Sequence, residues 1–220
     1  MCPRRYDASR RRAGVEATRL RILEAARSIV GGKGDLDGLS MEAVAAKAGV
    51  SRMTVYYQFH SRADLFEALA DQMAERGGMN RMREVFTEPD SEAALRKLVE
   101  TFVEFWATDR VTMRRLRAIG VVSPSQHAGP RSRDAWRREA IVNLLAKNGE
   151  MSAGPKPAPP ADLVDLLTAL TSFETFDALC TNSRDPEAVA TQLSSAAALL
   201  LRADPPARVQ RRRTRPTDAG

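Results

Sequence analysis

The chain has 220 residues, of which 43% are hydrophobic and 28% are charged, a balance that supports a buried core and excludes disordered and fibrous classes. The formal net charge of +6 favours polyanionic partners, although charge alone does not separate nucleic acid from lipid headgroups. The longest apolar run, residues 196–201, is too short to span a membrane, and no apolar segment of a secretory signal follows the basic start, so we expect a cytoplasmic protein without membrane contact.

The amino-terminal residues 1–14 are rich in arginine and lack hydrophobic periodicity. We expect a flexible basic arm there. Two interpretations stay open and carry equal weight: the arm contacts DNA in a groove or along phosphates, or it is a solvated tail. Helical periodicity begins at Val15 and runs to Val30, where the glycines of "GGKGDLDG" end it.

Three serines are placed as helix caps in the next segment. Ser40, Ser51 and Ser61 each precede a helical pattern, and Asp64 follows Ser61 at capping-box spacing. Leu39 is placed to pack on the helix that Ser40 caps, as a hydrophobic staple. We therefore expect four helices within residues 15–80.

The stretch "SMEAVAAKAGVSRMTVYYQF", residues 40–59, meets the requirements of a helix-turn-helix. Ala45 is small where two helices cross, Gly49 tolerates the positive φ of the turn, and Val55 faces back into the core. The side chains left on the outer face suit contact with base edges and phosphates in a major groove. These candidate DNA-binding residues are Ser51, Arg52, Met53, Thr54, Tyr56, Tyr57 and Gln58. For Tyr56, ring packing and an outward hydroxyl hold together.

The motifs "ILEAARSIV" and "LSMEAVAAKAGVSRMTVYYQFHSRADLFEAL" resemble the amino-terminal signature of the TetR family of bacterial transcriptional regulators. The resemblance covers residues 16 to 75. It implies that Thr54 and Tyr56 lie near the phosphate backbone, and that Arg62, where lysine is usual, opens the fourth helix against a phosphate. His60 stands where a proline or another turn residue is common, so the entry to that helix departs from the pattern.

Beyond residue 80 the sequence predicts longer helices, at 91–107, 109–121, 131–148, 161–181 and 186–202. Residues 149–160 read as a proline-containing loop, and residues 204–220 as a disordered basic tail. The expected organisation is an all-α chain with a helix-turn-helix domain at 15–80 and a helical ligand-binding and dimerisation domain at 81–203.

The last two predicted helices carry broad apolar stripes that need a partner. The chain's own helices could cover them, but the family resemblance implies a four-helix bundle formed with a second copy. A homodimer also suits DNA reading, because two short helices held about one DNA turn apart, or a multiple of it, can read a palindromic operator.

Large apolar side chains of the second domain are candidates for lining a ligand cavity. Taken singly, each is better explained by core packing, and only the resemblance favours a cavity. The candidates are Phe102, Phe105, Trp106, Met113, Leu116, Trp136, Leu144 and Phe173.

No catalytic or metal-binding constellation is evident in the sequence. The two histidines, His60 and His127, and the distant Cys2 and Cys180 provide neither a zinc set nor a disulfide framework, and no nucleophile sits in a recognisable context. We therefore predict that the chain is not an enzyme and that it has no cofactor and no metal.

These observations predict a ligand-responsive transcriptional regulator that represses from a palindromic operator until a small molecule binds its second domain. Ligand binding would shift the fourth helix and thereby the spacing of the two DNA-reading helices. Three alternatives stay open: a DNA-bound interaction or structural protein without a small-molecule ligand, a transcriptional activator, and a helical enzyme with an incidental hairpin. The sequence identifies neither the ligand nor the regulated genes.

Overall fold

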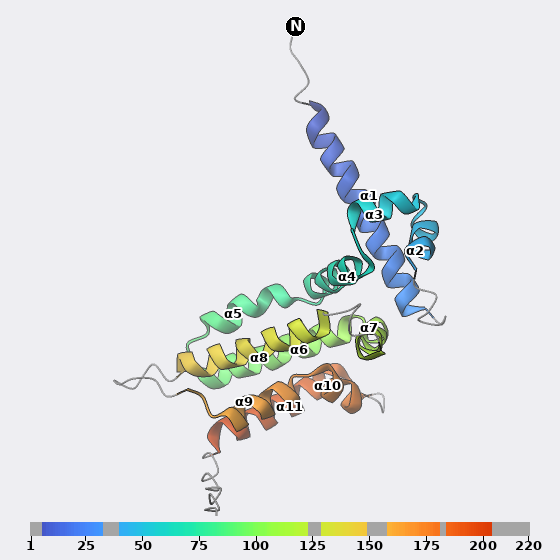
Figure 1. The fold of residues 1–220 in the computed structure, drawn as a ribbon. Helices are drawn as coiled ribbons and strands as arrows, with labels where there is room; N and C mark the ends of the chain where they lie inside the picture. The colour runs from blue at the N-terminus through green and yellow to red at the C-terminus, as the bar shows by residue number, and fades with distance from the viewer. Residues whose placement is uncertain (1–5, 33–39, 123–128, 149–157, 181–183, 204–220) are drawn as a thin grey trace, which may run out of the picture.

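The computed structural model describes residues 6–32, 40–122, 129–148, 158–180 and 184–203, and within these ranges the chain is helical without strands (Figure 1). The all-α architecture expected from the sequence is confirmed. The helices are α1 (Tyr6–Gly31), α2 (Met41–Ala48), α3 (Arg52–Gln58), α4 (Arg62–Arg76), the short 3-10 helix η2 (Met79–Arg81), α5 (Met82–Thr87), α6 (Ser91–Thr108), α7 (Arg110–Val122), α8 (Gly129–Asn148), α9 (Ala161–Leu170), α10 (Phe173–Leu179) and α11 (Pro186–Arg202).

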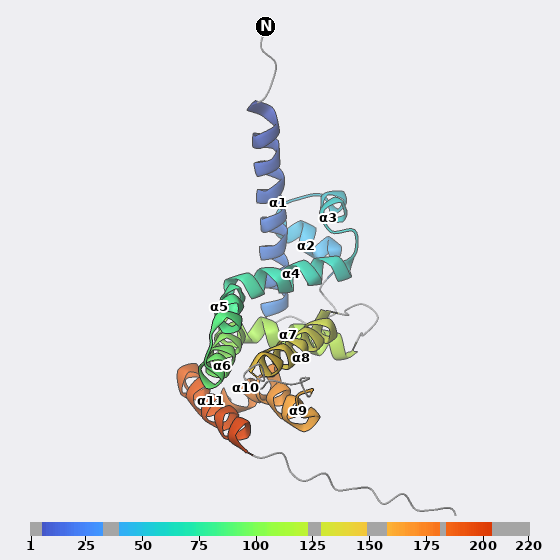
Figure 2. The ribbon, with the colours of Figure 1, turned by 90° about the vertical axis from the view of Figure 1, so that its left-hand side faces the viewer.

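The helices gather at two ends of an elongated molecule (Figures 1 and 2). Helices α1 to α4 lie at one end, where α1 packs against α2 and α4. At the other end α6 is central and contacts α5, α8, α10 and α11. Contacts of α1 with α7, and of α4 with α6 and α8, join the two ends, and one continuous apolar core runs through both.

All three predicted serine caps are present in the structure. The hydroxyl of Ser40 accepts a hydrogen bond from the Ala43 amide, that of Ser51 from Thr54, and that of Ser61 from Asp64. Each bond satisfies an amide that the first helical turn leaves unpaired. The predicted staple at Leu39 lies outside the described residues.

Helix α1 starts earlier than predicted. It begins at Tyr6, so residues 6–14 are helical instead of forming the expected flexible arm. The prediction relied on apolar periodicity, which signals burial, whereas side chains 9–17 of this helix are all exposed. Alanine and arginine favour a helix without any burial.

The helix predicted over residues 161–181 is broken between α9 and α10. Ser172 accepts a hydrogen bond from the Thr175 amide and so caps a new helix. The indole N–H of Trp106 donates to the carbonyl of Thr171 at 3.0 Å, where a continuous helix would supply a backbone amide. The break is therefore stabilised by a residue 65 positions away, which local sequence patterns do not reveal.

Two short elements, η2 and α5, were not predicted. They lie between Gly78 and Pro89, where glycine and proline leave room for only one or two turns. Residues 149–157 of the predicted loop and the predicted tail at 204–220 lie outside the described residues.

Gly49 adopts a φ of 64°, in the left-handed region that ends α2. We expect Gly49→Ala to lower the free energy of unfolding by about 1–2 kcal/mol, because a Cβ disfavours this conformation. Urea unfolding followed by circular dichroism measures the change. Gly14→Ala is the matched control, since nothing lies within 4 Å of a Cβ there and the residue is helical. An equal loss in both variants would contradict the assignment.

Candidate DNA-binding surface and effector region

The turn between α2 and α3 is built as the sequence predicts. Val44, Ala45 and Val55 are buried where the two helices cross. The amides of Gly49 and Val50 donate to carbonyls in the last turn of α2, to Ala46 and Ala45 respectively, which closes the turn and leaves the opposite side of α3 facing solvent.

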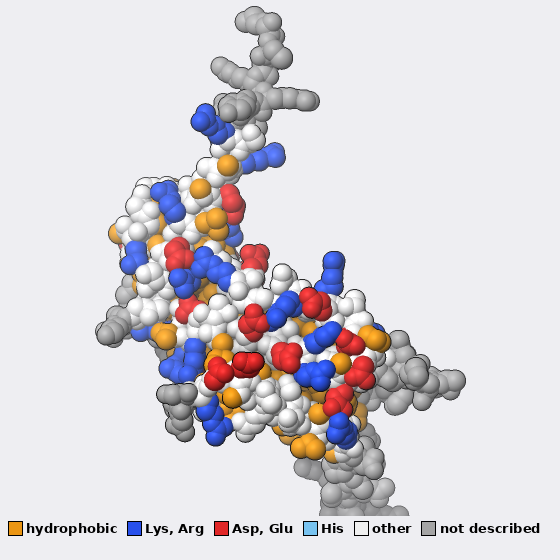
Figure 3. All heavy atoms as spheres, turned by 180° about the vertical axis from the view of Figure 1, so that it is seen from behind, with side chains coloured by type: hydrophobic (Ala, Val, Ile, Leu, Met, Phe, Trp, Pro, Cys, Tyr) orange, Lys and Arg blue, Asp and Glu red, His pale blue; other side chains and the backbone are white. Residues whose placement is uncertain are grey.

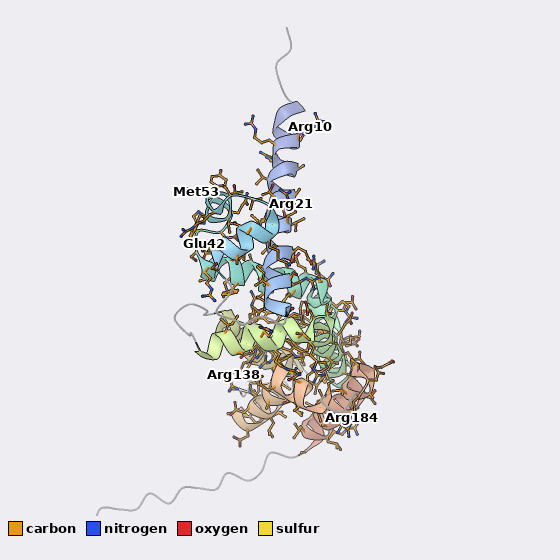
Figure 4. All side chains as sticks on the ribbon, turned by 90° about the vertical axis from the view of Figure 1, so that its right-hand side faces the viewer. Arg10, Arg21, Glu42, Met53, Arg138 and Arg184 are labelled. Carbon is orange, nitrogen blue, oxygen red and sulfur yellow. The ribbon has the colours of Figure 1, made fainter. Side chains whose placement is uncertain are left out.

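The outer side of α3 presents several of the predicted contact residues. Met53 is 75% exposed and Tyr57 79%, and the Arg52 side chain is 60% exposed. Figure 4 shows Met53 at the outer edge of the molecule beside α1. A helix of seven residues with this exposed face has the size and chemistry to enter a major groove.

Arg52 is held in place by two neighbours. Its Nε lies 2.7 Å from a carboxylate oxygen of Glu42 on α2. Its Nη2 is 3.4 Å from the Tyr56 hydroxyl, and the guanidinium lies 5.2 Å from the centre of that ring. Glu42, which the sequence analysis did not single out, therefore orients the arginine that is the strongest candidate for reading a base.

Ser51 and Thr54 are tied to each other at the start of α3. Their hydroxyl oxygens are 2.8 Å apart, and the Ser51 hydroxyl also accepts from the Thr54 amide at 3.1 Å. Ser51 is thus first of all a cap. Both residues lie at the amino end of α3, where helix amides favour a nearby phosphate.

Arg19 of α1 clamps the other end of α3. Its Nη1 donates to the Gln58 carbonyl at 3.3 Å, and its guanidinium lies 4.4 Å from the centre of the Phe59 ring. Sequence reasoning missed this role, since Arg19 looked like a solvent-facing residue between apolar positions. Gln58 itself is half-buried.

Arg62, the first residue of α4, is half-buried and lies 5.3 Å from the centre of the Phe66 ring. Its stem is therefore ordered by packing. Tyr56 is also half-buried and packs against the core with its ring, as predicted.

Four of the eight candidate ligand-lining residues form an aromatic cluster. Trp106 lies 6.0 Å from Phe102, 4.4 Å from Phe105 and 5.7 Å from Phe173, measured between ring centres. Phe176, which the sequence analysis did not select, extends the cluster from Phe173 at 6.5 Å.

The remaining candidates divide into two groups. Met113 and Leu116 on α7 and Leu144 on α8 are buried. Trp136 is 45% exposed. The structure thus brings most of the predicted apolar residues into one core region but leaves Trp136 at its surface.

Two arginines border the aromatic cluster. Arg137 is 4% exposed, donates to Asp134 at 2.7 Å, and lies 5.9 Å from the centre of the Phe102 ring. Arg117 contacts Asp134 at 3.1 Å and Glu174 at 2.5 Å. Burial lowers the pKa of Arg137, and its Nε has no hydrogen-bond partner among the residues that the structure describes. A buried guanidinium with an unused donor can orient a polar group of a small molecule.

Charged pairs cross the junction between the two ends of the molecule. Arg27 of α1 lies 2.7 Å from Asp109 at the start of α7, and Arg133 of α8 lies 3.2 Å from Glu67 and 2.9 Å from Asp71 on α4. The hydrogen bonds that Arg27 donates to Glu24 and Asp109 raise the pKa of Arg27. A cavity of about 30 Å³ beside Arg27 and Asp109 is large enough for one water molecule.

Charge on the outer surface is mixed. On the face shown in Figure 3, acidic and basic side chains alternate over the carboxy-terminal half. No helix in the described ranges combines the length and apolar character needed to cross a bilayer. The same ranges contain no group of three histidine, cysteine or acidic residues that could hold a metal ion.

Residues 22–69 match the family model of the bacterial regulatory proteins of the tetR family. The amino-terminal helices form a TetR-family domain. This match spans helix α1 from Ile22 through α2 and α3 to Leu69 of α4, which is the segment that holds the exposed face described above. A comparison with curated proteins finds no match.

Solved structures share the fold over most of the chain. A member of the TetR family from Streptomyces coelicolor A3 is 26% identical, with 81% of this chain and 96% of that one covered and a TM-score of 0.54. NalD, the secondary repressor of the MexAB-OprM multidrug efflux pump in Pseudomonas aeruginosa, is 22% identical over 84% and 96%, with a TM-score of 0.61. The multidrug binding protein EbrR, complexed with imidazole, is 24% identical over 94% and 96%, with a TM-score of 0.55.

The family model of bacterial regulatory proteins thus covers the amino-terminal helices, and the solved structures share the fold over most of the chain. Regulators of this family are not enzymes, which agrees with the prediction from the sequence. The names of the individual neighbours describe those proteins and leave open what this chain binds and which sign of control it exerts.

The outer face of α3 predicts different roles for Arg52 and Tyr56. We expect Arg52→Ala to reduce discrimination between base pairs at one operator position by about 1–3 kcal/mol, because arginine reads guanine edges. Tyr56→Phe removes only a hydroxyl and should weaken binding evenly across sequences, as loss of a phosphate contact does. Competition among randomised DNA fragments, read by sequencing, distinguishes the two outcomes. Unchanged sequence preference and affinity in both variants would refute these assignments.

Proposed function

We propose that this TetR-family regulator is a homodimeric repressor that binds a palindromic operator in the cytoplasm and leaves it when a small molecule binds the carboxy-terminal half. The observation that carries the DNA-binding part is the exposed face of α3, with Arg52, Met53 and Tyr57 turned to solvent. The proposed DNA-binding domain comprises residues 15–80, and the proposed effector-binding and dimerisation domain comprises residues 81–203.

Dimerisation is supported by apolar side chains left uncovered on the last helices. Leu166 of α9 and Leu199 of α11 are exposed, whereas Val189, Leu193 and Ala197 turn the other face of α11 into the core. A second copy would cover these leucines. Two copies of α3 would then read two half-sites, which a single helix of seven residues cannot do alone.

The proposed effector is a small molecule with an apolar body and at least one polar group. The aromatic cluster around Trp106 offers apolar contact area, and the unused Nε of buried Arg137 offers a donor at its edge. The imidazole complex of EbrR supports the idea that a helical bundle of this fold takes small molecules. NalD supports repression as the sign of control.

Coupling between effector and DNA is proposed to pass through the charged junction. Asp109 both accepts from the Thr112 amide at the start of α7 and pairs with Arg27 of α1. Arg115, also on α7, donates to the Gly32 carbonyl at 2.5 Å. An effector that displaces α7 would therefore pull on α1, and through Arg19 on α3. The effector must prefer the arrangement that fits DNA poorly.

The experiment starts from the purified full-length protein and sheared genomic DNA of the source organism. Bound fragments are sequenced, the common element is tested by gel shift at moderate salt, and a chemical library is screened for release. Sedimentation at micromolar concentration tests the dimer. Folded protein that selects no palindromic element would refute operator binding. A protein that binds DNA but responds to no compound, and instead captures a protein partner through this half, would favour the alternative of a DNA-bound interaction protein.

Asp109→Asn should weaken the coupling without abolishing DNA binding. The variant loses the charge that pairs with Arg27, but its amide oxygen can still accept from Thr112. Using a compound identified by the release screen, we expect the ratio of its affinities with and without operator DNA to fall severalfold towards one. Isothermal titration measures both affinities.

Asp165→Asn provides the matched control for this measurement. Asp165 of α9 pairs with Arg138 of α8, so the control removes an aspartate charge from an ion pair inside the carboxy-terminal half. A loss of coupling of the same size in Asp165→Asn would show that the effect is not specific to the junction.

A further inference from the structure

The first half of α1 projects from the molecule as a free-standing helix. Figures 1 and 2 show it extending past α3, on the side opposite the carboxy-terminal bundle. Arg19 contacts the end of α3 through the Gln58 carbonyl and the Phe59 ring. Side chains 9–17 before this point are all exposed.

The projecting segment is longer than a DNA groove is deep. Arg19 lies thirteen positions after Tyr6, which at 1.5 Å per residue is about 20 Å. The major groove is about 8.5 Å deep. If α3 lies in the major groove of a duplex, the first half of α1 is too long to end within the groove. It would instead lie beside the duplex, next to the sugar-phosphate backbone that borders the groove.

Helical periodicity decides which arginine of this segment turns towards that duplex. Arg12 precedes Arg19 by seven residues, almost two full turns, so it lies on the same face about 10 Å farther out. Arg10 precedes Arg19 by nine residues, which places it on the opposite face. Figure 4 shows Arg10 near the free end of α1, with Met53 of α3 to one side of the helix axis.

The charge of the segment fits a polyanion. The exposed positions 9–17 contain three consecutive arginines, residues 10–12, and one acidic residue, Glu16, so their net charge is positive. A solvated helix of this length gains little stability from its own hydrogen bonds. Contact with phosphates next to the α3 groove would add charge-assisted bonds and order the segment further.

We propose that the first half of α1 is a rigid helical arm that lies along the flank of the operator and contacts a backbone phosphate through Arg12, outside the bases covered by α3. The arm extends the footprint beyond the half-site and adds affinity without adding sequence preference. This goes beyond operator reading by α3, and it rests on the DNA binding proposed above.

The test compares Arg12→Ala with Arg10→Ala, which remove the same charge from opposite faces of one helix. Binding is measured by fluorescence anisotropy at several salt concentrations, on the operator identified by genomic selection, once with ten flanking base pairs on each side and once trimmed to the half-sites. We expect Arg12→Ala to reduce the salt slope on the long fragment by about one per phosphate, hence by about two per dimer. Affinity should fall severalfold on the long fragment and stay unchanged on the trimmed one.

The control variant and the two fragments decide among the outcomes. Arg10→Ala should change neither slope nor affinity by more than twofold. Equal losses in both variants would mean that the arm acts as diffuse charge, and no loss in either would mean that it is a solvated tail; both results overturn the proposal. Wild-type protein that binds no fragment would instead refute the proposed function.

Gly14→Pro separates a rigid helical arm from a flexible one. A proline at position 14 can serve as the first residue of a shortened helix, so the rest of α1 is retained, while residues 6–13 lose their helical connection. We expect this variant to match Arg12→Ala in its salt slope although all arginines are present. A slope equal to that of the wild type would show that helical geometry is not needed and would overturn the rigid arm.

Discussion

The close contact between α1 and α7 is the constraint on which the arrangement of the two ends depends. A Cβ on Gly31 would lie 2.7 Å from the Thr112 hydroxyl, so any larger residue there would have to displace the Thr112 side chain where α1 ends against α7. The neighbouring Gly32 carbonyl accepts from Arg115, and Arg27 one turn earlier pairs with Asp109. These contacts fasten one end of α1 to the carboxy-terminal bundle.

Because α1 is a single helix from Tyr6 to Gly31, the contacts that hold its carboxy-terminal end also constrain the orientation of the rest of the helix. Arg27 faces the junction, and Arg19, eight residues earlier, holds the end of α3. A helix transmits a tilt with little loss, since its backbone hydrogen bonds resist bending between the two points. The same helix therefore physically connects the proposed effector region with the proposed DNA-binding surface, and the pairs between Arg133 and α4 form a second connection.

Local chemistry explains what could be predicted from the sequence. The three capping serines, Gly49 and Val55 each act over a few residues, so their pattern predicts the helix-turn-helix and its exposed face. The fold of the second half was also predictable as a set of helices from apolar spacing. The break at Thr171 was not, because it depends on the indole of Trp106, nor was the early start of α1, because an exposed helix has no apolar stripe.

In the candidate effector region, too, the sequence predicted residue types but not their tertiary contacts. Composition predicted that large apolar side chains would meet, and Phe102, Trp106 and Phe173 do. It did not indicate that Arg137 would be buried beside them, since an arginine within "RDAWRREA" looks like a solvated helix face. The burial comes from packing against Phe102 of another helix, and the ion pair with Asp134 one turn earlier on α8 offsets part of its cost.

The ion pair between Arg52 and Glu42 has a consequence for how the protein searches for its target. A duplex at a distance meets this pair as a dipole, whose field falls off faster than that of a lone cation. Long-range attraction must therefore come from cationic side chains outside this pair. In the proposed function, Arg52 would act at close range, once a base edge replaces Glu42 as its partner. Attraction at a distance and reading of bases would then depend on different side chains.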